Sequence, residues 1–143
     1  MNSKEKRLIK SQEGYRSAIY RDTLSNLSGG WGHAFLERSV LPLGVWENIF
    51  EWDFGRASGE FFSLRLNHLD PVRRAVIISM LYNLGYIGVL GFKKMLHAVR
   101  FENWELAKAE MIDSAWHNQV GDRAAELEDM MLTGQWPEWM EKE

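Results

Sequence analysis

The segment from Asp70 to about Leu84 restricts the possible folds of this chain more than any other. Asp70-Pro71 is typical of a helix start, with an aspartate at the N-cap and a proline at the first helical position. From Val72 the segment is almost continuously apolar until Gly85 breaks it. A helix that is apolar all round has to be buried on every side. We therefore expect this helix to be the centre of a helical lobe built by the rest of the chain.

Length and composition limit what surrounds that helix. The 143 residues are enough for one domain with a sizeable core, and a hydrophobic fraction of 45% argues against disorder. The chain has no cysteine, which excludes disulfides, thiolate metal sites and a cysteine nucleophile. Neither a signal peptide nor a membrane-spanning segment is visible in the sequence, so we expect a protein that is soluble where it is made.

The first part of the chain combines a helix with short strands. We expect a helix over residues 3–13, ended by Gly14 and packed on the helical lobe. Residues 17–35 alternate apolar and polar side chains and are rich in turn-forming glycines, which predicts short strands. These strands would form a small strand-rich lobe over about residues 14–42.

The remainder is helical. Residues 43–62 carry apolar side chains at intervals of three and four, which predicts a helix connecting the lobes. Gly55 and Gly59 predict a kink or an early end in it. Residues 63–143 form the helical lobe, and shorter helices are expected at 92–100, at 103–115 and at 122–133, where Asp122 is the expected cap and Gly134 the end. The predicted fold is a single α+β domain over residues 1–143, predominantly helical.

Charge is distributed unevenly, although the net charge is only -3. Residues 63–100 carry six basic side chains and one acid, whereas residues 101–143 carry three basic side chains and eleven acids. Such a division most often reflects solvated helix faces; the functional alternative is that the basic stretch guides an anionic polymer towards a cleft. No nucleic-acid-binding motif accompanies the charge, so we expect no nucleic-acid partner.

Two carboxylates stand out near the N-terminus. Glu13 and Asp22 flank a short apolar segment, and Ser28 begins the run Ser-Gly-Gly-Trp-Gly-His. The negative end of a helix macrodipole would raise the pKa of Glu13, while a polar turn would keep Asp22 ionised. A proton donor, a charged carboxylate and a group that places a water are the parts of a glycosidase. On spacing alone, such a pair is more often an unrelated helix-end residue and turn residue.

Two residues of the glycine-rich run have alternative interpretations. His33 could be a ligand or a base, but no other histidine or cysteine is near it in sequence. We therefore expect a hydrogen-bonded histidine and no metal site. Trp31 could stack on a sugar or pack in the core.

The chain resembles the phage-type lysozymes, glycoside hydrolase family 24. That family carries a Glu, eight residues later an Asp, five residues later a Thr, and then Gly-x-Gly-His. Glu13, Asp22, Ser28 and the segment 30–33 stand in this register without a gap. Further segments resemble the family in the correct order across nearly the whole chain, namely Asp70-Pro-Val-Arg-Arg-Ala75, Asn83-Leu-Gly85, Gly88-Val-Leu-Gly91-Phe92, Trp116-His-Asn-Gln119 with Arg123, and Gly134-Gln-Trp136.

The resemblance implies a lysozyme-like two-lobed fold and a role for each residue. Glu13 would protonate the glycosidic oxygen, Asp22 would stabilise the developing positive charge or assist the water, and Ser28 would help to hold that water. The implied substrate-binding residues are Trp31, His33, Tyr82, Asn83, Gln119 and Arg123.

The resemblance also implies a substrate and a biological setting. The substrate would be peptidoglycan, cut between N-acetylmuramic acid and N-acetylglucosamine by a monomeric enzyme without a cofactor or metal. The enzyme would release phage progeny, staying in the host cytoplasm until a holin permeabilises the membrane and then attacking the periplasmic wall.

Departures from the family keep two alternatives open. Ser28 replaces the usual threonine, Gly29 replaces a β-branched residue and should loosen the strand, and the acidic balance is unusual for an enzyme acting on an anionic wall. The first alternative is a lytic transglycosylase, which needs no water-holding residue and which Ser28 slightly favours. The second is a non-catalytic wall-binding protein, against which the intact Glu13 and Asp22 count.

Overall fold

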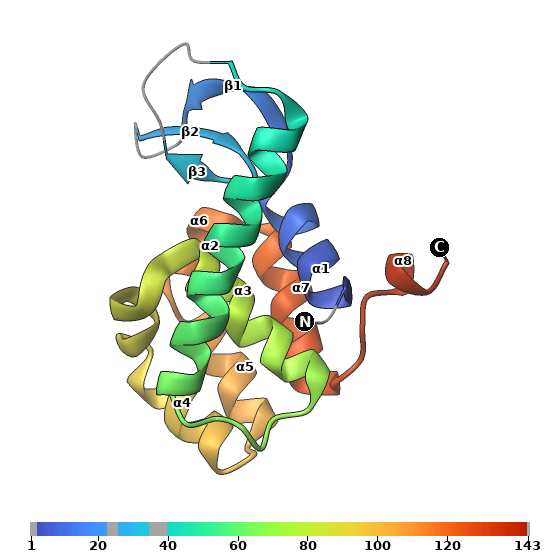
Figure 1. Ribbon diagram of the computed structural model, residues 1–143. Coiled ribbons are helices and arrows are strands. Elements are labelled where there is room, and N and C mark those ends of the chain that lie inside the picture. The colour runs from blue at the N-terminus through green and yellow to red at the C-terminus, as the bar shows by residue number, and fades with distance from the viewer. Residues whose placement is uncertain (1–2, 23–25, 35–39, 143) are drawn as a thin grey trace.

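A computed structural model describes residues 3–22, 26–34 and 40–142, and it shows a mostly helical α+β fold with a small sheet at one end (Figure 1). This confirms the predicted fold class. The elements in chain order are α1 (Ser3–Glu13), β1 (Arg16–Arg21), β2 (Leu27–Gly30), β3 (His33–Ala34), α2 (Leu43–Ser63), α3 (Pro71–Leu90), α4 (Lys93–Arg100), α5 (Trp104–Ile112), α6 (Ala115–Val120), α7 (Asp122–Thr133) and α8 (Glu138–Glu141).

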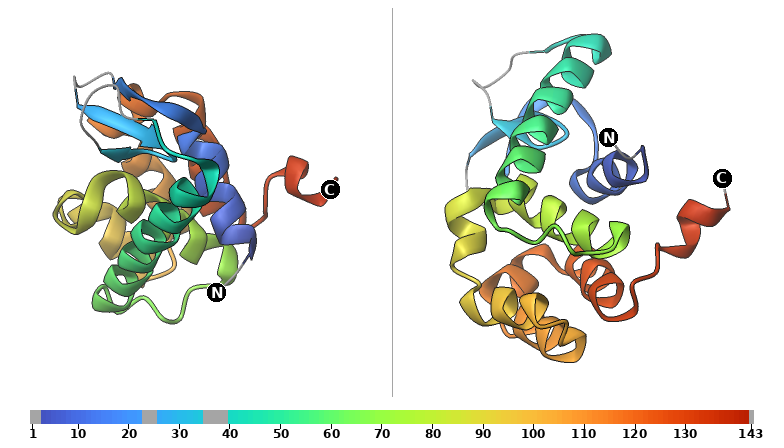
Figure 2. Two further views of the ribbon diagram at one scale, coloured as in Figure 1. Left: turned by 45° about the horizontal axis from the view of Figure 1, so that its top comes forward. Right: turned by 60° about the horizontal axis from the view of Figure 1, so that its bottom comes forward.

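The sheet has three antiparallel strands in the order β1-β2-β3. Tyr20 on β1 pairs with Ser28 on β2, which pairs in turn with Ala34 on β3. α2 runs from beside the sheet down along the other helices, contacting β2 and β3 at one end and α3 along its length (Figures 1 and 2). The strands therefore form a small lobe that α2 joins to the helical lobe.

α3 is the buried centre of the helical lobe, as the sequence predicted. Asp70 caps it by accepting a hydrogen bond from the backbone N–H of Arg73 at 3.0 Å. Every residue from Ala75 to Leu81 is buried, and α1, α2 and α7 pack around them. The predicted break at Gly85 is present, but a second helical segment follows it directly. Gly85 leaves the helical conformation (φ 75°), but the chain resumes the helix after this one residue and continues for another turn, where Val89 is buried in the core.

α2 does not end early at Gly55 or Gly59, which corrects the expectation from the sequence. Packing explains the difference, because one face of the helix is buried and this burial outweighs the low helix propensity of two glycines. The side chains on that face are Trp46, Phe50, Phe54, Ala57 and Phe61. Both glycines lie on the opposite, exposed side.

We expect Gly59→Ala to raise the free energy of unfolding by about 0.5–1 kcal/mol. A Cβ atom at this position would meet nothing within 4 Å, and alanine restricts the unfolded chain. Chemical denaturation measures the change. If bending at Gly59 contributes to closure of the lobes, the variant should also turn over more slowly; unchanged turnover in a stabilised variant would exclude this glycine as a hinge.

Gly29→Ala is the matched control. It should lower the free energy of unfolding, because β2 is tightly packed at this point. A Cβ atom on Gly29 would lie 2.8 Å from Cη2 of Trp46, and one on Gly30 would lie 2.6 Å from Cε3 of the same ring. The indole also donates a hydrogen bond to the carbonyl of Ser17 at 3.3 Å. The expected loosening at Gly29 is therefore wrong, because the glycine makes room for a large side chain on α2.

The C-terminal helices differ from the expected ones in three places. The segment 103–115 is divided, because the side chain of Ser114 caps a separate helix, α6. Asp122 is the first residue of α7 and not its cap, since Gly121 occupies the N-cap position with φ 66°. α8 was not expected. Gly134 ends α7 in the left-handed conformation, as predicted.

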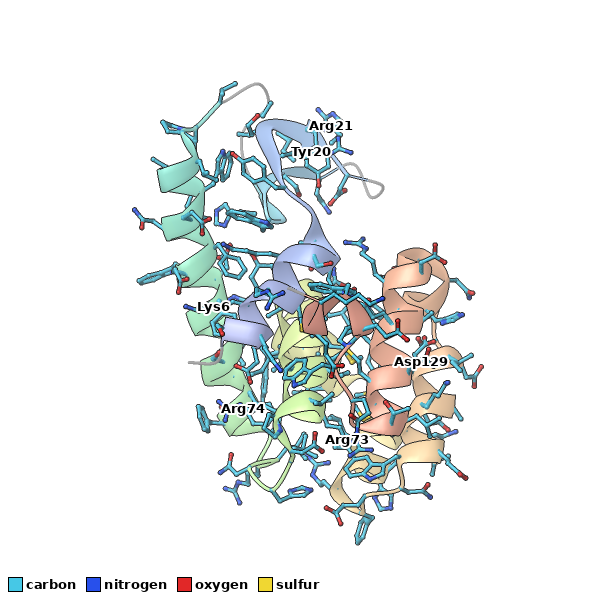
Figure 3. All side chains as sticks on the ribbon, turned by 90° about the vertical axis from the view of Figure 1, so that its right-hand side faces the viewer. Lys6, Tyr20, Arg21, Arg73, Arg74 and Asp129 are labelled. Atoms are coloured by element: carbon cyan, nitrogen blue, oxygen red, sulfur yellow. The ribbon has the colours of Figure 1, made fainter. Side chains whose placement is uncertain are left out.

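Part of the basic stretch is structural. Arg73 donates hydrogen bonds to the carbonyls of Met131 at 2.8 Å and Leu132 at 2.9 Å, both in the last turn of α7. Arg74 lies 3.4 Å from the buried carboxylate of Glu5 and so connects α3 to α1. Both arginines lie in the first turn of α3, between the helices they join (Figure 3).

Within the described ranges no single helix is long and apolar enough to cross a membrane. α3 and α4 reach that hydropathy only when taken together, and they are bent by 105° relative to each other.

Candidate active site

Glu13 is the last residue of α1, where Gly14 ends the helix with φ 69°. Burial raises the pKa of the Glu13 carboxyl to about 7, and the positive charge of Arg123 partly opposes that rise. The direction agrees with the sequence prediction, and the largest cause is burial. A carboxyl group with this pKa holds a proton near neutral pH, as a general acid must.

Gly32 lies directly against the carboxylate of Glu13. Its φ is 80°, and a Cβ atom there would lie 2.8 Å from Oε2 of Glu13. Glycine alone combines this backbone conformation with so close an approach. The turn between β2 and β3 therefore forms one wall around the acid, which accounts for part of its burial.

Asp22 immediately follows β1 at the tip of the hairpin. Its Oδ1 accepts a hydrogen bond from the backbone N–H of Asn26 at 2.9 Å, and its own N–H donates to the carbonyl of Asn26 at 2.8 Å. These two bonds fix the carboxylate at the end of the strand. Ser28 lies on the neighbouring strand and is only 6% exposed.

Glu13 and Asp22 line one groove of about 420 Å³. The sequence prediction did not include Tyr15, Arg16, Tyr20 and Arg21, which also line it together with Gly14 and Arg123. Tyr20 and Arg21 lie on the strand lobe above α1 and α7 (Figure 3). Their position between the two carboxylates in the sequence is the signal that could have identified them. Ser28 does not line this groove, although it pairs with Tyr20, which does.

Three residues of the predicted binding set, Trp31, His33 and Tyr82, make side-chain contacts between different helices and strands. The ring of Trp31 packs on Phe50, with centroids 5.6 Å apart, and Nζ of Lys10 lies 4.1 Å from its centre. Nδ1 of His33 lies 2.6 Å from a carboxylate oxygen of Asp53 on α2, so the expected hydrogen-bonded histidine is found. The hydroxyl of Tyr82 donates to the carbonyl of Trp31 at 2.6 Å. Whether these residues also contact a substrate stays a prediction.

The other predicted binding residues are divided between three hollows. Arg123 lines the groove with Glu13 and also lines a small adjoining hollow with Glu13 and Asn83. The side chain of Asn83 accepts a hydrogen bond from the indole of Trp116 at 3.1 Å. Gln119 and Trp116 line a separate hollow of about 580 Å³. We assign the chemistry to the smaller groove, because the larger hollow contains neither Glu13 nor Asp22.

Comparison with known proteins finds relatives that share nearly the whole chain. Probable T4-type lysozyme 1 of Dictyostelium discoideum is 27% identical over 94% of this chain and 96% of its own length. Probable T4-type lysozyme 2 of the same organism is 25% identical over the same shares. The pre-baseplate central spike protein Gp5 of Enterobacteria phage T4 is 24% identical over 89% of this chain but only 27% of its own length. No protein-family model matches the sequence. The chain is thus a homologue of the T4-type lysozymes, which are glycoside hydrolases.

Proposed function

We propose that the protein is a muramidase that hydrolyses the β-1,4 bond between N-acetylmuramic acid and N-acetylglucosamine in peptidoglycan. One observation carries the proposal. Glu13, whose pKa is raised to about 7, lines the same groove as Asp22, which is held by the backbone of its own hairpin. Two carboxyl groups in different environments are the requirement for glycoside hydrolysis.

In the proposed reaction, each group acts on one side of the scissile bond. Glu13 donates its proton to the glycosidic oxygen, so that the leaving sugar departs as an alcohol. Asp22 stays negatively charged and stabilises the positive charge that develops on the other sugar, or it activates the attacking water. The water supplies a hydroxyl group to the new reducing end and returns a proton to the enzyme.

The charge of the groove fits an anionic polymer although the whole chain is acidic. Three guanidinium groups line the groove, from Arg16, Arg21 and Arg123, against two carboxyl groups. The lining is positive even with both carboxyl groups ionised, and below pH 7 it becomes more so because the Glu13 carboxyl is mostly neutral, while the net charge of the chain is -3. Salt screens charge interactions beyond about 8–10 Å at ordinary ionic strength. A polymer in the groove therefore interacts mainly with the charges that line it and less with the net charge of the whole chain.

A lysis assay with analysis of the products tests the proposal. The purified protein should clear a suspension of permeabilised Gram-negative cells, and mass spectrometry should find products ending in a reducing muramic acid. A 1,6-anhydro end would instead identify a lytic transglycosylase. No clearing and no product would leave a wall-binding protein.

Ser28→Ala tests whether the serine hydroxyl takes the water-holding role implied by the threonine of related enzymes. We expect the rate of hydrolysis to fall by about tenfold or more, on the order of 1.4 kcal/mol, and Ser28→Thr to keep or improve it. Initial rates on soluble wall fragments measure both. An intact rate in Ser28→Ala together with an anhydro product would favour the transglycosylase.

We extend the proposal to the biological setting of a monomeric phage endolysin that stays in the host cytoplasm until a holin opens the membrane. This setting is what the resemblance to the phage-type lysozymes implies; the phage relative found is a baseplate spike protein and does not itself support it. Expression inside Gram-negative cells should be tolerated, and lysis should follow only when a holin is co-expressed. Lysis without a holin would contradict the proposed holin dependence. A dimer in size-exclusion chromatography would contradict the proposed monomeric state.

A further inference from the structure

The side chain of Tyr82 connects the helical lobe to the wall of the acid's pocket. Tyr82 lies on α3 and is buried, with its ring 5.7 Å from that of Phe50. Its hydroxyl donates a 2.6 Å hydrogen bond to the carbonyl of Trp31, in the turn between β2 and β3. This bond therefore runs from one lobe to the other.

The carbonyl that accepts this bond belongs to the peptide group joining Trp31 to Gly32. Gly32 is the residue whose backbone lies against Oε2 of Glu13. The indole of Trp31 already packs on Phe50 and Tyr15, so ring contacts set where the turn lies. The hydrogen bond adds what ring packing does not supply, because it fixes the plane of the peptide that faces the carboxylate.

Other roles for Tyr82 fit the structure less well. It does not line the groove that holds Glu13 and Asp22, and its one hydroxyl proton is donated to a backbone carbonyl. Burial, together with the negative charges of Asp53 and Glu13, raises the pKa of the phenol further above its ordinary value. The phenol is therefore neutral throughout the working range of pH and is not a base.

We propose that Tyr82 is a positioning residue for the general acid: through the peptide group between Trp31 and Gly32 it holds the turn that keeps water away from the Glu13 carboxyl. The catalytic part of this inference rests on the proposed function, in which Glu13 is the acid. The structural part concerns the titration of Glu13 and can be measured without any substrate.

Tyr82→Phe removes the hydroxyl and keeps the ring, and Tyr86→Phe is the matched control one turn further along α3. The Glu13 carboxyl is followed by NMR titration of protein with ¹³C-labelled glutamate, and Glu13→Gln assigns its signal. We expect the Glu13 pKa to fall from about 7 towards 4.5 in Tyr82→Phe and to stay unchanged in Tyr86→Phe. An unchanged Glu13 titration in Tyr82→Phe would overturn the proposal, whether or not the protein is active.

Kinetics on soluble wall fragments separates positioning from substrate contact. In Tyr82→Phe we expect kcat to fall about tenfold with KM unchanged, because the acid is displaced in the bound complex. The rate falls at high pH where Glu13 loses its proton, so a lower Glu13 pKa moves this basic limb to lower pH. A raised KM with unchanged kcat and an unchanged limb would show that Tyr82 binds substrate instead. If the wild-type protein cleaves nothing, the proposed function fails and the titration alone decides the role of Tyr82.

Discussion

Glu13→Gln should fold normally. Its rate of wall hydrolysis should fall by about 10²–10⁴-fold, which is the usual contribution of a general acid. Glutamine fills the same space and keeps a hydrogen-bond donor, but it has no proton to give to the leaving sugar. Release of reducing ends from soluble wall fragments measures the loss. Glu51→Gln, on α2 and outside the groove, is the control and should keep wild-type activity.

The same substitution should change how stability depends on pH. The folded pKa of Glu13, about 7, lies above its ordinary value of 4.5, so the folded state favours the protonated form. This stabilisation is complete below about pH 4.5 and is lost as the pH rises to 7. Relative to wild type, Glu13→Gln should therefore gain stability across this window, by no more than about 3 kcal/mol because the side chain keeps some exposure.

Two outcomes would contradict this account of Glu13. Activity within a few-fold of wild type would remove the residue from the general-acid role. A constant difference in unfolding free energy between the two proteins from pH 4.5 to 7 would show that the carboxyl is not desolvated in the folded state. The two measurements are independent, since only the first needs a substrate.

Local rules predicted the parts of the fold that depend on neighbours in sequence. The cap at Asp70, the buried helix after it and the stop at Gly134 all follow from a few adjacent residues, and all are present. The errors occur where distant residues decide. Gly55 and Gly59 stay helical because the opposite face of α2 is buried, and Gly29 is constrained by Trp46 across the lobe. Neither the burial of that helix face nor the contact with Trp46 can be read from a short stretch of neighbouring residues.

The candidate site shows the same division. The family resemblance, and not spacing alone, indicated that Glu13 and Asp22 form a carboxylate pair, and both line one groove. The spacing could not give the reason for the raised pKa of Glu13, because burial depends on a turn that comes close only after folding. The partner of His33 was also invisible, since Asp53 lies on another element twenty residues away.

Gly32→Ala should reduce the rate of hydrolysis by about 10²-fold while costing only about 1–2 kcal/mol of stability. The new Cβ atom would lie 2.8 Å from Oε2 of Glu13, which is too close for any real contact. That oxygen is at the end of a flexible side chain, so the clash is relieved by moving the carboxylate and not by unfolding the turn. The movement displaces the acid from the position in which it can protonate the leaving sugar.

Gly121→Ala separates this clash from backbone strain. Gly121 also has a positive φ, 66°, but a Cβ atom there would meet nothing within 4 Å. It should lose stability by a similar or larger amount and keep its activity per folded molecule, whereas Gly32→Ala should lose activity out of proportion to its stability. Thermal unfolding and initial rates on the same preparations give both quantities. Equal losses of activity in the two variants would mean that strain alone is responsible, and the contact between Gly32 and Glu13 would then have no catalytic role.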